Sequence, residues 1–321
     1  MLRYVSVFAA VLFVMASFYV VRGQEPVSCG FDKSTLKFSG ASELDQAKCL
    51  LRKVKEGGNL GPRPQTLPEP LESLIGQPVA ANEAAYKQLK LALRNYLTAH
   101  KIPEASVGGS LDHPLSRARN NEPAAPLATY FVIHDTSTPN LCDVARFPDN
   151  INESSWTWND VDRYKNSTEA HLYITRDGQS IAPQQRSFAT AWRATQVERP
   201  KADLRAKGLF LHIENVQPRR CAEQPPARCY RINPKTGARK CREDSKVGPE
   251  PGFSEAQMER LALVYVTASV RRKQWMVPAF HAALDAGISG GHDDPQNFDL
   301  ATWANKLCSL LQILQQPCPG R

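Results

Sequence analysis

The stretch "GLFLHIENV", residues 208–216, decides the fold class of this chain. It is a short, nearly continuous apolar run that begins at a glycine, which is typical of a strand buried in a sheet. Because side chains alternate along a strand, Phe210, His212 and Glu214 share one face. The segment therefore predicts a core strand that carries two ionisable groups on one side.

Glu214 is the unusual member of this strand. An ionised carboxylate inside an apolar strand is costly unless it is paired or faces a wet cleft. Two interpretations follow from the pattern alone. The face is the solvent side of an edge strand, or Glu214 is a general base beside a reacting water.

Strands and helices alternate on either side of this stretch. "ATYFVIHD", residues 128–135, predicts a strand that ends at His134, and "AHLYITRDGQSIAP", residues 170–183, predicts a hairpin with Asp177–Gly178 at its turn. A helix capped by Ser254 and Gln257 is expected to run to about residue 273. The last helix is indicated by apolar residues at helical spacing, namely Trp303, Leu307, Leu310, Leu311 and Leu314. The pattern predicts an α/β domain with a mixed central β-sheet flanked by helices.

The first 23 residues have the features of a secretory signal peptide. Arg3 precedes a long apolar run, and small residues lie near the expected cleavage point after Gly23. An uncleaved membrane anchor is the alternative, because the run nearly reaches the roughly 20 residues that a span needs. We expect a secreted or periplasmic protein with no stable membrane insertion after cleavage.

The chain divides by composition into further parts. Residues 24–103 predict a small, mainly helical accessory module, and residues 104–126 predict a linker because they lack periodicity. The main domain is expected at 127–316, with a polar, cysteine-bearing insertion at 217–250.

Two helices are expected in the accessory module. Ser42 and Asp45 resemble a capping box for a first helix that Gly57–Gly58 would end. Asn82 is placed to cap a second helix near residues 83–100. The function of this module is not readable from its sequence.

The formal charge is +8 at pH 7, and +6 once Arg3 and Arg22 leave with the signal peptide. A basic exported protein suits an anionic polymer such as a cell wall. The basic residues form no run interleaved with aromatic residues, so nucleic acid is not expected as a partner.

All eight cysteines lie after the signal peptide, an even number that predicts disulfides in an oxidising compartment. None forms a CxxC pair, which argues against a zinc ribbon or a thioredoxin-like site. Proximity suggests Cys29–Cys49, Cys308–Cys318 and one pair among Cys221, Cys229 and Cys241, which leaves Cys142 with a distant partner.

Histidines and aspartates supply candidate metal ligands. A catalytic zinc ion takes three protein ligands and leaves a fourth position for water. His134 at a strand end, His281 in "VPAFHAALDAG" and the aspartates of "GGHDDPQNFDL", residues 290–300, are of the right type. Each of them singly is also explained as a core histidine or a turn aspartate.

The order of four segments resembles a known family. "YFVIHDTS", "AHLYITRDGQSIAPQ…ATAWRAT", "LFLHIENV" and "FHAALDAGISGGHDDPQNFDL" are similar to those of zinc-dependent N-acetylmuramoyl-L-alanine amidases. These AmpD-like enzymes are related to peptidoglycan recognition proteins, and the resemblance covers about residues 127–305. It implies an amidase/peptidoglycan-recognition-like fold.

The resemblance also implies roles for particular residues. His134, His281 and Asp294 match the ligands of one Zn²⁺ per chain. Glu214 matches the strand glutamate that acts as general base on the attacking water. His292 lies where many relatives carry a lysine that stabilises the tetrahedral intermediate.

The chain departs from the family pattern in several places. Thirteen residues separate His281 from Asp294, a longer spacing than in the relatives, and Asp293 is a rival ligand. Arg193 in "AWRAT" replaces a histidine near the substrate groove and is a candidate substrate contact. His212 shares the Glu214 face and is expected either to contact substrate or to support a ligand.

The resemblance implies an exported zinc hydrolase that cleaves the amide between N-acetylmuramic acid and L-alanine in peptidoglycan or its fragments. The alternative is a protein of the same fold that binds peptidoglycan or muropeptides without hydrolysis. A third interpretation is a different zinc hydrolase or a metal-free binding protein.

Overall fold

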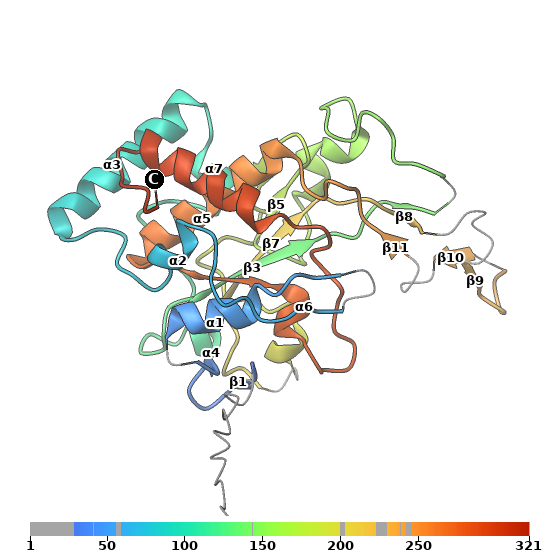
Figure 1. The fold of residues 1–321 in the computed structure, drawn as a ribbon, viewed down its shortest axis with the longest axis horizontal. Coiled ribbons are helices and arrows are strands. Elements are labelled where there is room, and N and C mark those ends of the chain that lie inside the picture. Colours follow the sequence, from blue (N-terminus) through green and yellow to red (C-terminus); the bar gives the residue numbers. More distant parts are fainter. Residues whose placement is uncertain are drawn as a thin grey trace, which may run out of the picture.

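The computed structural model describes residues 29–320 except 41, 56–58, 143, 200–202, 223–229, 238 and 242–245 (Figure 1). The predicted signal peptide, residues 1–23, lies outside the described residues. Within the described part of the chain, no helix is both long and apolar enough to cross a bilayer.

A five-stranded mixed sheet forms the centre of the protein, as the sequence predicts. The strand order is β12 (Val277–Phe280), β3 (Tyr130–Asp135), β7 (Phe210–Asn215), β5 (Leu172–Ile174) and β6 (Ser180–Ile181). The first four strands are parallel, and β6 pairs antiparallel with β5, which confirms the predicted hairpin. β3 is buried along its length and β7 at every residue except the half-buried Glu214, because helices or loops cover both faces.

Two helices cover one face of the sheet. They are α5 (Glu255–Arg272), which has the predicted Ser254–Gln257 capping box, and α7 (Leu300–Ile313). Tyr265 of α5 meets Phe131 of β3 edge to face at 5.2 Å and Trp303 of α7 at 5.2 Å. α3 (Glu83–Ala99), which has the predicted Asn82 cap, contacts α5 (Figure 1).

N-terminal elements cover the other face. They are β1 (Phe31–Asp32), β2 (Lys37–Phe38) and α1 (Glu43–Leu50). Phe38 contacts Tyr130 edge to face at 5.4 Å, and the Tyr130 hydroxyl donates to Gln46 Oε1 at 2.6 Å. The apolar side chains of these elements belong to the same hydrophobic cluster as those of the sheet.

The segment between α3 and the sheet also contributes to this cluster. It contains η2 (Glu104–Val107) and α4 (Ala118–Asn121), and Val107, Leu111 and Leu115 are buried. The short α2 (Leu71–Leu74) precedes α3 and buries Leu71.

The insertion after β7 forms further strands. β8 (Arg219–Cys221) lies between β4 (Asn140–Leu141) and β11 (Lys246–Val247) in a small sheet. β9 (Tyr230–Ile232) and β10 (Arg239–Cys241) pair separately (Figure 1).

The first helix is shorter than its sequence pattern predicts. The Ser42–Asp45 capping box is confirmed, but α1 ends at Leu50 and not at Gly57–Gly58. Val54 instead forms a β-bridge with Leu60. The apolar periodicity misled us because Leu51 and Val54 are buried in the same core without being helical.

The edge strand β12 was not expected from the sequence. It has only four residues and contains Pro278, which lacks the N–H that a central strand would use. Its place at the edge of the sheet, paired only with β3, explains why proline is tolerated there.

Two predicted disulfides are confirmed. Cys29 pairs with Cys49, and Cys308 pairs with Cys318. Cys142 and Cys221 are disulfide-bonded as well. The side chains of Cys229 and Cys241, named in the remaining expectation, lie outside the described residues.

We predict that Phe38→Ala lowers the free energy of unfolding of the whole described chain by about 3–5 kcal/mol, because a buried aromatic ring on the sheet is lost. Chemical denaturation followed by tryptophan fluorescence checks this. Leu91→Ala, at a side chain that is 59 % exposed on α3, is the control and is expected to change little. If the N-terminal elements unfolded in a separate transition, and only that transition shifted in Phe38→Ala, these elements would not share a core with the sheet.

Candidate metal centre

Two ionisable side chains face each other at the carboxyl ends of β3 and β7. The parallel register pairs His134 with Glu214. β7 lies between β3 and β5, so the interpretation of Glu214 as a solvent-facing residue of an edge strand is wrong. Ligand sites in open α/β sheets lie at this edge, outside the carboxyl ends of the strands.

The neighbouring strand brings His281 to the same edge. β12 runs parallel to β3, and α6 (His281–Leu284) begins directly after it. Asp294 returns to this point on the following loop: its carbonyl oxygen accepts from the Ala282 N–H at 2.8 Å. Its Oδ2 also accepts from the Asp135 backbone N–H at 3.1 Å. The thirteen residues from His281 to Asp294 therefore form a loop whose two ends are held together by hydrogen bonds.

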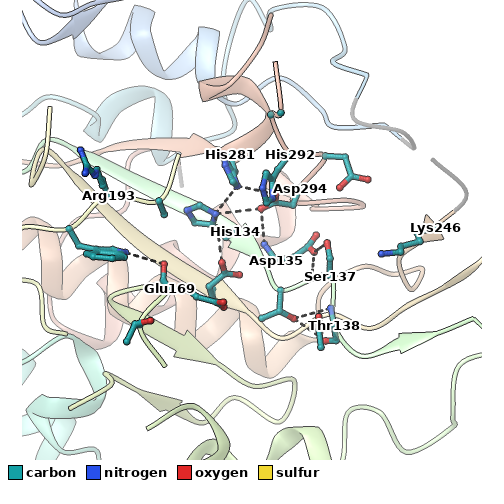
Figure 2. A pocket seen from close by; sticks show the side chains of 18 of the residues that line it. His134, Asp135, Ser137, Thr138, Glu169, Arg193, Lys246, His281, His292 and Asp294 are labelled. Atoms are coloured by element: carbon teal, nitrogen blue, oxygen red, sulfur yellow. Dashed lines mark hydrogen bonds and ion pairs between the residues drawn. The ribbon is translucent and has the colours of Figure 1, made fainter. Parts of the chain in front are cut away.

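Three donor atoms converge between these elements (Figure 2). His134 Nδ1 lies 2.9 Å from His281 Nδ1, which lies 3.0 Å from Asp294 Oδ1. His134 Nδ1 is 3.6 Å from Asp294 Oδ2. All three residues are buried, and one ligand atom from each lies within 4.8 Å of the others. This set of His134, His281 and Asp294, which we call the metal group, could hold a metal ion.

A carboxylate behind His281 fixes its tautomer. His281 Nε2 lies 3.0 Å from Asp285 Oδ2, so the ring donates its Nε2–H there and directs Nδ1 toward the group. Asp285 in turn accepts the backbone N–H groups of Gln196 and Val197 at 2.9 and 3.0 Å. We missed Asp285 in the sequence, although its i,i+4 spacing from His281 is a usable signal.

An imidazole lies behind His134. His134 Nε2 is 3.0 Å from His212 Nδ1. His212 is fully buried and is not among the residues that line the cavity described below. It therefore lies behind the ligand and not where a substrate would contact it.

The electrostatics of the group favour a bound cation. Burial and the neighbouring His281 lower the pKa of His134 well below its ordinary value, so its ring is neutral. Burial also acts to lower the pKa of His281, but Asp294 and Asp285 outweigh it and raise that pKa to about 10. Since two Nδ1 atoms and a carboxylate face one point, either a proton on His281 Nδ1 or a metal ion is needed to offset their repulsion.

Glu214 lies beside this group. Its Oε1 is 3.9 Å from His134 Nδ1, and within the described residues its buried Oε2 has no hydrogen-bond partner. Burial and the nearby charge of Asp294 raise the pKa of Glu214 well above its ordinary value. The Glu214 carboxylate is therefore a stronger proton acceptor than an ordinary glutamate.

The group opens into a cavity of about 880 Å³ (Figure 2). Arg193 and Lys246 both line it, on opposite sides of the metal group in this view. Trp192, whose ring stacks on the Arg186 guanidinium at 4.0 Å, forms part of the wall. The cavity is large enough for a ligand of several chemical groups.

The two candidates of the "HDDP" segment are separated by the structure. His292 lies at the rim with 61 % of its side chain exposed, and its ring lies 4.6 Å from that of His281. Asp293 Oδ2 accepts from Gln296 Nε2 at 2.8 Å. Asp294 and not Asp293 belongs to the metal group among the described residues.

The insertion contributes a residue that supports the centre. Arg219 of β8 binds both carboxylate oxygens of Asp135 at 2.8 and 2.7 Å, in a fully buried ion pair. Asp135 also accepts the Gln296 backbone N–H at 3.0 Å. Arg219 thus ties the insertion to the strand and loop that carry two ligands. Sequence reasoning missed it because nothing marks one arginine in a polar insertion.

No family model, curated protein or solved structure matches this chain.

We predict that binding of a divalent metal ion at pH 7 releases about one proton per chain. The His281 pKa of about 10 means that its Nδ1 is protonated without metal, and a metal ion must displace that proton. Metal affinity is therefore expected to rise as the pH rises toward 10. Calorimetric titration with Zn²⁺ in buffers of different ionisation enthalpy measures the proton count. A count near zero would contradict the proton that we place between His281 and Asp294.

Proposed function

We propose that this protein is an exported zinc hydrolase that cleaves the amide between N-acetylmuramic acid and L-alanine in peptidoglycan or its fragments. The observation that carries the proposal is the meeting of His134, His281 and Asp294 with Glu214 on the wall of one open cavity. Export is consistent with the disulfides, among them Cys29–Cys49 and Cys308–Cys318.

The donor set suits zinc. Two imidazole nitrogens and one carboxylate oxygen are ligands that catalytic zinc ions use, and the side toward the cavity remains open. A bound zinc ion lowers the pKa of a coordinated water toward neutrality and polarises the scissile carbonyl. Asp285 and His212 hold the two rings in the orientation that presents Nδ1.

Glu214 handles the proton in this mechanism. Its unpartnered Oε2 accepts the proton of the attacking water and later passes it to the leaving amine. The raised pKa of the Glu214 carboxyl makes it a stronger proton acceptor than an ordinary glutamate, which suits the step in which it takes the proton of the water. Its position next to His134 keeps the transfer distance short.

His292 is the residue at the rim that stabilises the oxyanion. It is the exposed imidazole nearest to the metal group, with Nδ1 3.7 Å from Asp294 Oδ1. A ring N–H aimed at the developing negative charge lowers the barrier by electrostatic stabilisation. Stacking on His281 limits how the ring turns.

Peptidoglycan as substrate is supported by the sequence resemblance, the basic charge and the form of the cavity. The chain carries a formal charge of +8, which favours an anionic wall polymer. Arg193, Arg199 and Lys246 line the cavity and are able to contact acidic groups of a muropeptide.

The first test incubates the mature protein with purified peptidoglycan, with and without a chelator, after its zinc has been quantified. We expect about one zinc per chain and chelator-sensitive release of L-alanine amino termini with intact sugar chains. Zinc with muropeptide binding but no release would favour the non-catalytic alternative. A protein without zinc and without release would overturn the proposal.

We predict that Glu214→Gln lowers the rate of hydrolysis by about 10²–10⁴-fold while zinc remains bound, because the base is lost and the ligands are not. His134→Ala is expected to lose both zinc and activity. Zinc content and initial rates on peptidoglycan measure the two effects. Glu83→Gln on α3, outside the cavity, is the control. Full activity in Glu214→Gln would show that another group is the base.

A further inference from the structure

We infer that Glu198 acts through His212 as a positioning residue that fixes the tautomer of His134, and so sets the metal affinity of the centre. The inference rests on the metal centre of the proposed function but not on its substrate. It concerns a chain of three buried side chains, His134, His212 and Glu198, which we call the relay.

The relay is continuous in space. His134 Nε2 lies 3.0 Å from His212 Nδ1, and His212 Nε2 lies 3.0 Å from Glu198 Oε2. His212 and Glu198 have fully buried side chains. Among the described residues His212 Nε2 has no partner that meets hydrogen-bond geometry, so its contact with Glu198 Oε2 is a close ion-pair contact.

The position of Glu198 is fixed independently of the histidines. Its Oε2 accepts the N–H groups of Ala194 and Thr195 at 3.0 and 3.1 Å and the Thr195 hydroxyl at 2.8 Å. These bonds belong to a capping box at the start of η5 (Gln196–Glu198). The oxygen that faces His212 is thus an acceptor held by three donors, which favours the charged carboxylate.

The charge of Glu198 determines where the relay carries its protons. A lone pair on His212 Nε2 at 3.0 Å from a carboxylate oxygen would be repelled, so Nε2 must carry a hydrogen. With a single proton on its ring, His212 then has a lone pair on Nδ1, which can only accept. His134 must donate its Nε2–H to it, and His134 Nδ1 is left with the lone pair that a metal ion needs.

A third histidine holds the His212 ring without entering the relay. His171 Nδ1 accepts the His212 backbone N–H at 3.0 Å, and its Nε2–H donates to the Thr190 carbonyl at 2.9 Å. Its ring stacks on that of His212 within 10° at 5.5 Å. Both His171 nitrogens are occupied, so His171 fixes the plane of His212 without competing for its protons.

The opposite tautomer would disable the centre. If His212 carried its proton on Nδ1, that N–H would donate to His134 Nε2. His134 would then carry its own proton on its Nδ1. That proton would then occupy the metal position between His134 and His281. A residue two side chains away from the metal therefore controls whether the first ligand is available.

The test measures zinc affinity by competition with a chromophoric chelator, independently of turnover. Glu198→Gln removes the charge but keeps the shape, and we expect about 10–100-fold weaker zinc binding. His212→Phe removes the acceptor for His134 and is expected to have an effect of at least this size. The double variant should bind no more weakly than His212→Phe alone, because the residues act in series. Glu104→Gln, which alters a carboxylate bonded to Arg94, is the matched control.

A second measurement needs no variant. Long-range ¹H–¹⁵N spectra of zinc-free wild-type protein labelled in histidine report each tautomer, and we expect His134 and His212 to carry hydrogen on Nε2. Loss of that tautomer in Glu198→Gln would separate positioning from a merely structural role. A wild-type His212 protonated on Nδ1 would overturn the inference even if the variants failed to fold.

The outcomes distinguish this inference from the proposed function. Unchanged zinc affinity in Glu198→Gln, in a protein that cleaves peptidoglycan, would overturn the relay and leave the function intact. Weakened zinc binding in Glu198→Gln, in a protein whose wild type releases no L-alanine, would overturn the function and support the relay. A wild-type protein that binds no zinc would overturn both.

Discussion

The convergence of unshared electron pairs at the carboxyl edge of the sheet is the constraint on which the rest of the site depends. β12, β3 and β7 run parallel, so their ends deliver His281, His134 and Glu214 to one place. Burying two imidazole nitrogens within 2.9 Å of each other is unfavourable unless a cation lies between them. Side chains behind the rings favour this arrangement, because Asp285 accepts the His281 Nε2–H and, in the relay that we infer, His212 accepts the His134 Nε2–H.

The elements around the sheet hold this edge from both faces. On the N-terminal side, Phe38 and Gln46 contact Tyr130, at the start of the strand that carries His134. At the other end of β3, Asp135 is neutralised by Arg219 and also bonds to the loop that carries Asp294. Removing one partner of such a buried pair leaves an uncompensated charge and costs about 3–5 kcal/mol. The insertion is therefore part of the support of the metal loop.

The sequence predicts the regular parts of this protein well and the supporting contacts poorly. Strand alternation and helix caps identify the mixed sheet, the hairpin and the three helix starts at Ser42, Asn82 and Ser254, since these signals are local. The three residues that could hold a metal ion are also named from the sequence, because histidines and aspartates near predicted element ends are common ligand types. The strand β12 is not predicted from the sequence because it is short and contains proline. Arg219 and Glu198 act across long sequence distances, and no local pattern marks them.

The segment from Trp192 to Glu198 connects the substrate side of the site to both histidine ligands. Trp192, Arg193 and Ala194 line the cavity. The next residues support the metal group: Gln196 and Val197 hold Asp285 by their N–H groups, and Glu198 meets His212. A displacement of this one segment would therefore disturb the partners of His281 and His134 together. Because the same short piece of chain lines the cavity and contacts the partners of both rings, a change in the cavity wall would also move the side chains that orient the candidate ligands.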